Sequence, residues 1–335
     1  MQFFAISCRN TLSCCLLALL LTGCVATPQN ETIGNQIAAL MREGQEHYAA
    51  RRYDEAIAKF ATLTARDANN WQGFVWLARA YIAKPSWTEA IAAARRAHTL
   101  SPGGQGVVPV LAEALFGGGS AALTAGSFKA AIGHFTDYIA LEPGNARAYL
   151  NVGRALLGDK RFADALSALL KGLSQATGPE RTEFLKGLIE GGVKALGEGE
   201  FGSAIAFLRE ALKLDPANIR AIIDLVKSFI GNGDFAGALS AIQEALKRVS
   251  GSERGELLRS LFDNGRQALA TGRAREAASF LREYVRHDSA NLNAYLDLAR
   301  SYWQSGERSE ALEAVRRALQ INPRSQEALR LLPGG

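Results

Sequence analysis

Cysteine is nearly absent from this chain of 335 residues, and where it occurs it is confined to the beginning. The four cysteines are Cys8, Cys14, Cys15 and Cys24. Because no cysteine follows Cys24, the rest of the sequence can form no internal disulfide and offers no thiol nucleophile or thiolate metal ligand.

Histidine is also rare, and the net charge is small. The four histidines are scattered without a common spacing, so the sequence predicts neither a metal-ligand cluster nor a Ser/His/Asp catalytic set. They are His47, His98, His134 and His287. The formal net charge of +5 is too slight to indicate a nucleic acid partner. We therefore expect a protein that is not an enzyme and that binds no metal, cofactor or nucleic acid.

Long apolar runs are rare, and the clearest lies between Leu12 and Leu21. This run is too short to span a bilayer as a mature helix. It ends in Leu21-Thr22-Gly23-Cys24, which resembles the bacterial lipobox. In that family the signal is cut before the cysteine, which is then acylated. The resemblance implies a signal peptide at residues 1–23 and lipidation at Cys24. The alternative is an ordinary signal peptide with an incidental cysteine.

The lipobox resemblance also carries an expected location. Acyl chains on Cys24 would anchor the protein to a membrane without a spanning helix. The next residue is Val25, not Asp, which in Gram-negative lipoproteins favours the outer membrane with the protein facing the periplasm. Residues 24–36 are polar and aperiodic after the cysteine and are expected to form a flexible tether.

Most of the remaining sequence is repetitive. Eight alanines recur at spacings of 34, 41, 34, 39, 34, 39 and 34 residues. A period of about 34 residues is typical of helix–turn–helix solenoids. With the alanine at position 20, the expected units are residues 37–70, 71–104, 112–145, 146–179, 185–218, 219–252, 258–291 and 292–325.

Other positions of the unit agree with this alignment. Position 8 is Gly or Ala in seven units, which lets two helices pack closely. Position 17 is aromatic in six units and is expected to staple the start of the second helix, helix B, to its own helix pair. Position 15 is glycine in five units, in the expected turn. Proline stands at position 32 in four units, where helix B must stop.

This pattern resembles the tetratricopeptide repeat. The second unit carries the closest match. Its matching residues are Phe74, Leu77, Ala78, Tyr81, Ala90, Ala97 and Pro102. The resemblance implies an all-α, right-handed superhelical solenoid of about eight helix–turn–helix repeats over residues 37–325. Proteins of this family are scaffolds that bind other proteins.

The longer spacings divide the eight units into four pairs. Short inserts at residues 105–111, 180–184 and 253–257 separate the pairs and are expected to lengthen the next first helix, helix A, by one to two turns. Residues 326–335 are too short for another unit and are expected to form a capping stub. The segment Gly197-Glu198-Gly199-Glu200-Phe201-Gly202 fits a nucleotide-binding pattern, but it falls on a repeat turn and follows no strand.

In the tetratricopeptide family, positions 2, 5, 9 and 12 of helix A line the concave face. In this chain positions 2 and 9 are mostly basic and positions 5 and 12 are apolar, which predicts a groove for partners with acidic and apolar residues. Its candidate residues are Arg79, Phe116, Arg147, Arg154, Lys186, Arg220, Lys227, Arg259, Phe262, Arg266, Arg300 and Trp303. Acids at position 6, as in Arg220/Asp224/Lys227, leave a second interpretation open, a solvated ion-pair face without a ligand.

Two functions fit these observations. The first is a non-catalytic, outer-membrane-anchored adaptor for assembly of an envelope complex, in pilus or secretion systems, outer-membrane assembly or polysaccharide export. The alternative is a regulatory accessory lipoprotein that binds a cell-wall enzyme or an acidic glycan. The sequence indicates nothing about the oligomeric state.

Overall fold

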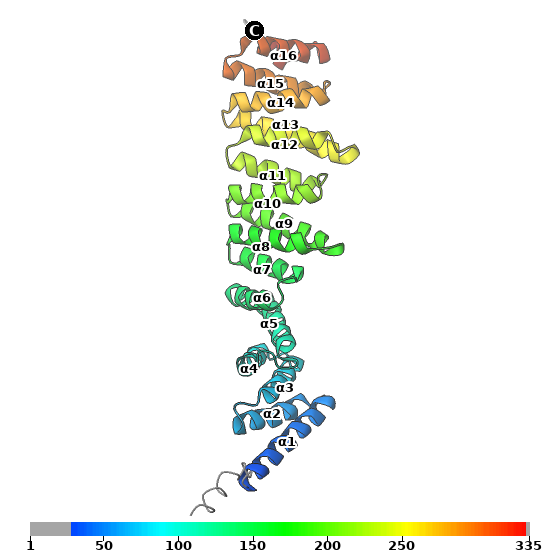
Figure 1. Cartoon of the computed structure of the whole chain (residues 1–335). Helices are drawn as coiled ribbons and strands as arrows, with labels where there is room; N and C mark the ends of the chain where they lie inside the picture. The colour runs from blue at the N-terminus through cyan, green and yellow to red at the C-terminus, as the bar shows by residue number, and fades with distance from the viewer. Residues whose placement is uncertain (1–27, 333–335) are drawn as a thin grey trace, which may run out of the picture. The chain divides into compact units, whose positions relative to one another are not determined.

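The computed structural model describes residues 28–332, and within that range all regular structure is α-helical (Figure 1). The signal peptide predicted for residues 1–23 and the lipidation predicted at Cys24 lie outside the described residues. The chain divides into two compact units, residues 1–118 and 119–335. The predicted all-α fold of successive helix pairs is confirmed.

The first unit contains four complete helices, and α5 (Val107–Thr124) crosses the boundary between the units. The four are α1 (Pro28–Ala49), α2 (Tyr53–Arg66), α3 (Trp71–Ala83) and α4 (Trp87–Leu100). The second unit continues with helix pairs that each pack on the next. Its helices are α6 (Phe128–Leu141), α7 (Ala146–Gly158), α8 (Phe162–Gln175), α9 (Pro179–Gly197), α10 (Phe201–Leu214), α11 (Ile219–Gly231), α12 (Phe235–Leu246), α13 (Gly251–Ala270), α14 (Ala274–His287), α15 (Leu292–Ser305), α16 (Arg308–Ile321) and α17 (Gln326–Arg330).

An asparagine caps every second helix A. The side chain of Asn145 accepts a hydrogen bond of 3.1 Å from the backbone N–H of Ala148, and this bond satisfies one of the free donors at the start of α7. The same cap recurs at Asn70, Asn218 and Asn291. Ser325 caps α17 in the same manner. These caps fix where the helices begin.

Small residues at position 8 bring the two helices of a repeat together, as predicted. A Cβ atom at Gly153 would lie 2.6 Å from Leu169, and one at Gly192 would lie 2.5 Å from Leu208. Leu169 and Leu208 are fully buried. Both leucines stand at position 24 of their repeats. The contact between positions 8 and 24 therefore recurs with the repeat.

The turn between helices A and B needs a left-handed backbone at position 15. Gly199 has φ of +78°, which glycine adopts without a steric penalty, so the segment 197–202 is a repeat turn as predicted. Lys160 and Arg51 occupy position 15 of their repeats with φ of +60° and +58°.

The predicted long helices are present. Helices α9 and α13 have 19 and 20 residues, whereas α7 and α11 have 13 each. In Figure 1 the places where α9 and α13 begin project beyond their neighbours in the second unit. The N-cap of α9 is Gly178, with proline at the first helical position. Ser250 precedes α13 but makes no capping hydrogen bond through its side chain.

Two expectations need correction. The flexible tether predicted for residues 24–36 does not reach residue 36, because helix α1 begins at Pro28. Proline is tolerated at a helix start, where its missing N–H would have no partner. The aromatic residue at position 17 follows the expectation only in part. The ring centroid of Tyr53 lies 5.6 Å from that of Tyr48 in its own repeat, whereas the rings of Phe128 and Phe201 face Gly158 and Gly231 of the following repeat. These two phenylalanines therefore join neighbouring repeats.

Helix α5 is apolar and long enough to cross a membrane by length and composition. Of the residues in this helix, 44% are buried inside the fold. A Cβ atom at Gly117 would overlap the ring of Trp87, and one at Gly119 would lie 2.9 Å from Phe135. These close approaches are typical of a core helix that packs on its neighbours.

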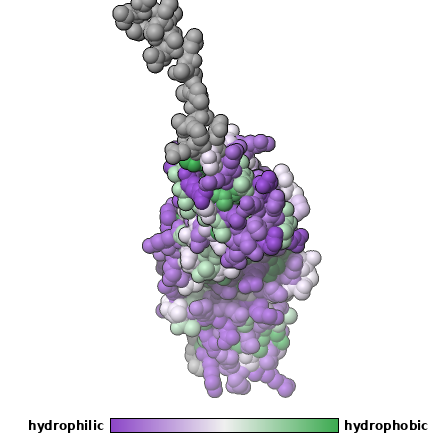
Figure 2. All heavy atoms as spheres, turned by 90° about the horizontal axis from the view of Figure 1, so that it is seen from below, coloured by the Kyte–Doolittle hydropathy of each residue, from purple (hydrophilic) through white to green (hydrophobic). Residues whose placement is uncertain are grey.

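Most large apolar side chains of residues 28–332 are buried or half-buried. The largest fully buried side chains include Phe135, Phe207 and Phe280. The face shown in Figure 2 is largely hydrophilic, with apolar residues in small separate areas. Among the described residues, only Ile33, Ile321 and Leu329 are large apolar side chains classed as exposed.

Candidate binding surface

In the second unit the first helices of successive repeats lie side by side. Helix α7 contacts α9, α9 contacts α11, α11 contacts α13 and α13 contacts α15. Positions 2, 5, 9 and 12 of these five helices form the helix-A face. Most of the candidate residues belong to it, whereas Arg79 and Phe116 belong to the first unit.

The basic residues at position 9 of the helix-A face are already paired with acids. Arg154 lies 3.3 Å from Glu183, and Lys227 lies 3.1 Å from Asp224. Arg266 lies 3.4 Å from Asp297, whose carboxylate also accepts a 2.9 Å hydrogen bond from Arg300. Arg300 additionally pairs with Glu327 of α17. This row corresponds to the ion-pair interpretation of the sequence.

The basic residues at position 2 behave differently. Arg147, Arg220 and Arg259 are exposed, and within residues 28–332 none of them forms an ion pair or a side-chain hydrogen bond. Lys186, the fourth basic residue of this row, lies 2.7 Å from Glu183. The helix-A face therefore presents three unpaired guanidinium groups, one on each of α7, α11 and α13.

Two of these arginines stand where a cation is unfavourable for the helix. Arg147 and Arg220 are the second residues of α7 and α11. The amino-terminal end of a helix carries a partial positive charge, so a cation there costs about 0.3–1 kcal/mol. Helix stability does not account for arginine at these positions, whereas an anionic ligand would.

The apolar positions 5 and 12 divide into two groups. Leu157 and Leu296 are buried between helices and cannot contact a ligand without a rearrangement, and Leu150 is buried except where it lines a hollow between α7 and α9. The others are half-buried and reach the surface of the helix-A face. They are Ile189, Leu196, Ile223, Ile230, Phe262, Leu269 and Trp303. The ring centroid of Phe262 lies 5.1 Å from that of Tyr284 and 5.6 Å from the guanidinium of Arg266.

A hollow of about 310 Å³ opens between α7 and α9 on this face. Its basic side is formed by Arg147 and Arg154, and its base by Leu150 and Phe184. Pro179, Glu180 and Glu183 of the lengthened α9 complete its wall. The hydrogen bond from Lys186, together with the charge of that ammonium group, lowers the pKa of Glu183, so this acid is ionised and neutralises part of the site.

The first unit has a separate hollow of about 340 Å³. Arg79 is the only cation among the described residues that line it, and its guanidinium lies 4.9 Å from the ring centre of Trp76. The hollow is lined by Met41, Gln45, Trp71, Gln72, Val75, Trp76, Arg79, Gln105 and Gly106. Phe116, the other candidate residue of this unit, is half-buried in α5.

Comparison with known proteins identifies the repeats. Two tetratricopeptide repeat models together match residues 41–104, 116–179, 195–261 and 268–332. The chain belongs to the tetratricopeptide repeat family. The family indicates a scaffold for protein–protein interaction.

One curated relative and several solved structures resemble this tetratricopeptide protein. The Hsp70-Hsp90 organizing protein of Triticum aestivum is 39% identical over 100 residues, and the chain spans about 16% of its length. A tetratricopeptide repeat protein from Parabacteroides merdae is 10% identical, with a TM-score of 0.36 and coverage of 89% of this chain and 98% of that one. MamA from Desulfovibrio magneticus is 15% identical, with a TM-score of 0.32 and coverage of 64% and 96%.

The tetratricopeptide alignment predicts the helix-A face but not the division within it. Charge alone did not distinguish the paired position 9 from the unpaired position 2. The signal that was available is the helix register, because Arg147 and Arg220 follow the asparagine caps by two residues. A basic residue so close to a cap has no preceding turn in its own helix from which an acid could reach it.

Proposed function

We propose that this tetratricopeptide protein is a non-catalytic adaptor that binds partner segments carrying acidic and apolar side chains on the helix-A face. The observation that carries the proposal is the row of unpaired arginines at position 2, Arg147, Arg220 and Arg259. Their guanidinium groups can each bind a carboxylate in a bidentate geometry.

The half-buried apolar residues beside this row supply the second part of the recognition. Ile189, Ile223 and Phe262 lie at position 5 of their repeats, three residues after the basic position 2. A segment in which acids alternate with apolar residues would place its acids on the arginines and its apolar side chains on this strip. Electrostatic complementarity of this type sets specificity and association rate more than affinity.

The proposed location is the inner face of the outer membrane, with acyl chains on Cys24 as the anchor. Support comes from the Leu21-Thr22-Gly23-Cys24 motif and from Val25. In this arrangement the repeats would hold components of an envelope complex together. Labelling of cells with a radioactive fatty acid tests the anchor, since a Cys24→Ala variant should lose both the label and membrane association.

Affinity capture from envelope extracts tests the adaptor role. The bait is the chain with Arg147→Glu and Arg220→Glu, compared with the natural sequence. The matched control is Lys129→Glu with Arg275→Glu, since these are also the second residues of their helices, α6 and α14, and are exposed. Partners should disappear with the first variant and persist with the second. Retention of every partner by the first variant would overturn the proposal.

A charged glycan would also be attracted by the unpaired arginines, and the apolar strip distinguishes the two ligands. Changing Ile189 and Ile223 to Gln leaves the charges in place. A protein segment should bind at least tenfold more weakly to this variant, because its apolar side chains lose their contacts. Unchanged binding, together with a steep loss in 0.5 M salt, would support the accessory lipoprotein that recognises an acidic glycan.

A further inference from the structure

In the second unit, α16 is followed by the short helix α17, which stands in the register of a further helix A. Helix α17 begins like the capped helices α3, α7, α11 and α15, with a side-chain cap from Ser325 and a small buried residue, Ala328, at position 3. Helix α17 has five residues and ends at Arg330, whereas α15 has 14 residues. The sequence that follows Leu332 is Pro333-Gly334-Gly335, which does not favour helix.

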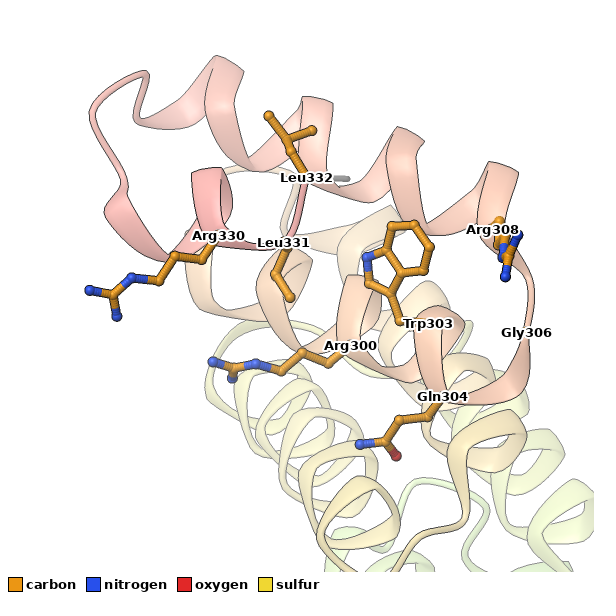
Figure 3. Close-up of a pocket in the computed structure, with 8 residues that line it drawn as sticks. All are labelled: Arg300, Trp303, Gln304, Gly306, Arg308, Arg330, Leu331 and Leu332. Atoms are coloured by element: carbon orange, nitrogen blue, oxygen red, sulfur yellow. The ribbon is translucent and has the colours of Figure 1, made fainter. Parts of the chain in front are cut away.

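A hollow of about 750 Å³ lies where the rest of this helix A would pack (Figure 3). It is lined by the second half of α15, the start of α16 and the end of α17. Its residues are Arg300, Trp303, Gln304, Gly306, Arg308, Arg330, Leu331 and Leu332.

The repeat pattern indicates that the later turns of a full-length helix A would pack in this hollow. In earlier repeats the residue at position 17, such as Phe128 or Phe201, contacts position 13 of the following helix A. In the eighth repeat position 17 is Arg308, and it borders the hollow instead. The leucine at position 4 of helix A is also less covered in α17. Leu188 and Leu261 are fully buried at this position, whereas Leu329 is 38% exposed.

The hollow has a distinct chemistry. Arg308 and Arg330 have no ion pair within the described residues, and no acidic side chain lines the hollow there. Trp303, Leu331 and Leu332 supply an apolar surface between the two guanidinium groups (Figure 3). The indole N–H of Trp303 is buried and has no hydrogen-bond acceptor among residues 28–332. An apolar surface between cations suits an amphipathic helix that carries acids beside its apolar stripe.

We propose that the end of the second unit formed by α15, α16 and α17 binds an amphipathic, acidic helix of a partner protein, which packs in the hollow between Arg308 and Arg330. This site lies at the α15 end of the helix-A face and shares Arg300 and Trp303 with it, whereas Arg147 and Arg220 lie on α7 and α11.

The test uses the full chain and a synthetic 18-residue helical peptide with Leu at positions i, i+3, i+4 and i+7 and Glu beside them. Fluorescence anisotropy should detect binding, and Arg308→Glu with Arg330→Glu should weaken it at least tenfold. The same peptide with Lys in place of Glu should not bind the natural chain. Because the helix-A face is itself proposed to bind acidic and apolar segments, the measurement is repeated in a chain that carries Arg147→Glu and Arg220→Glu. Peptide binding should persist in that chain, and adding Arg308→Glu with Arg330→Glu should then weaken it at least tenfold, so a failure at the end site is distinguishable from a failure on the helix-A face.

Three outcomes would overturn the proposal. The first is unchanged peptide binding by Arg308→Glu with Arg330→Glu. The second is loss of binding in the Arg147→Glu and Arg220→Glu control, which would place the peptide on the helix-A face. The third is concentration-dependent dimerisation that Arg308→Glu with Arg330→Glu abolishes, since a second copy of the chain would then be the occupant. Circular dichroism of each variant checks that the fold is intact.

Discussion

The guanidinium of Arg266 lies 3.4 Å from the carboxylate of Asp297, and this ion pair joins the seventh repeat to the eighth. Asp297 is 12% exposed at its side chain, and Arg300 holds the same carboxylate from within α15. One acid therefore neutralises two position-9 arginines on neighbouring helices. The pairing removes these arginines from the set that is available to a ligand.

Replacement of Asp297 by Asn should destabilise the second unit by about 1–2 kcal/mol, because two arginines lose a largely buried partner. Urea unfolding monitored by circular dichroism measures the change. Asp263→Asn is the matched control, since Asp263 occupies the same position 6 but is exposed and, among the described residues, unpaired. Its effect should stay within about 0.5 kcal/mol. Equal effects of the two variants would contradict the assigned role of Asp297.

Replacement of the unpaired arginines, in contrast, should not lower the free energy of unfolding. Arg147→Glu and Arg220→Glu should each leave stability unchanged or raise it by about 0.3–1 kcal/mol, because an acid in the first turn interacts favourably with the helix dipole. Thermal unfolding at low salt measures this effect. A marked loss of stability would mean that these arginines support the fold, and the argument for a ligand at position 2 would fail.

The close contact of the two helices within a repeat can be tested at Gly192. A methyl group there would lie 2.5 Å from Leu208, so Gly192→Ala should cost about 1–3 kcal/mol through overpacking. A methyl group at Gly133, in α6, would meet no atom within 4 Å. Gly133→Ala should therefore raise the free energy of unfolding by up to about 1 kcal/mol through helix propensity. Urea unfolding of both variants measures the changes, and effects of the same sign would contradict this separation of packing from propensity.

Acid sensitivity should depend partly on Glu283 in α14. Burial of this carboxylate raises its pKa, but the hydrogen bond from Gln243 and the positive charge of Arg286 outweigh burial, so the net pKa is lowered. A lowered folded-state pKa stabilises the protein above the unfolded value of about 4.3, and this stabilisation is lost as the pH falls through the folded pKa. Glu283→Gln should flatten the profile of unfolding free energy against pH below about pH 5. An unchanged profile would exclude this contribution.

The repeat positions allowed much of the fold to be predicted from the sequence. Gly153 and Gly192 recur at a fixed position because each must admit a large side chain from the facing helix, and such a requirement leaves a periodic signal. The pairing of Arg266 with Asp297 leaves none, because the sequence offers Asp263 three residues away as an equally plausible partner. Only the packing of α13 on α15 brings Asp297 within reach.

The binding surfaces show the same limit. The basic and apolar character of the helix-A face follows from positions 2, 5, 9 and 12, but burial removes Leu157 and Leu296 from it. The hollow beside Trp303 depends on where α17 stops and on what Arg308 fails to contact. Each property has a correlate in the sequence, since Arg308 replaces the aromatic of position 17 and Pro333 follows α17, but the sequence does not show that Arg308 and the end of α17 border one hollow.

The asparagine caps have a consequence for how the chain could change in length. Asn145 and Asn218 cap α7 and α11 through the same acceptor and the same residue offset. Deletion of residues 146–218 would join Asn145 directly to Ile219, and Asn145 would then accept from the N–H of Ala221 as Asn218 does now. The joint is chemically unchanged, so loss or duplication of one such segment preserves the start of the next helix. A gene encoding this chain could therefore shorten or lengthen the array in steps of two repeats, with no new sequence at the junction.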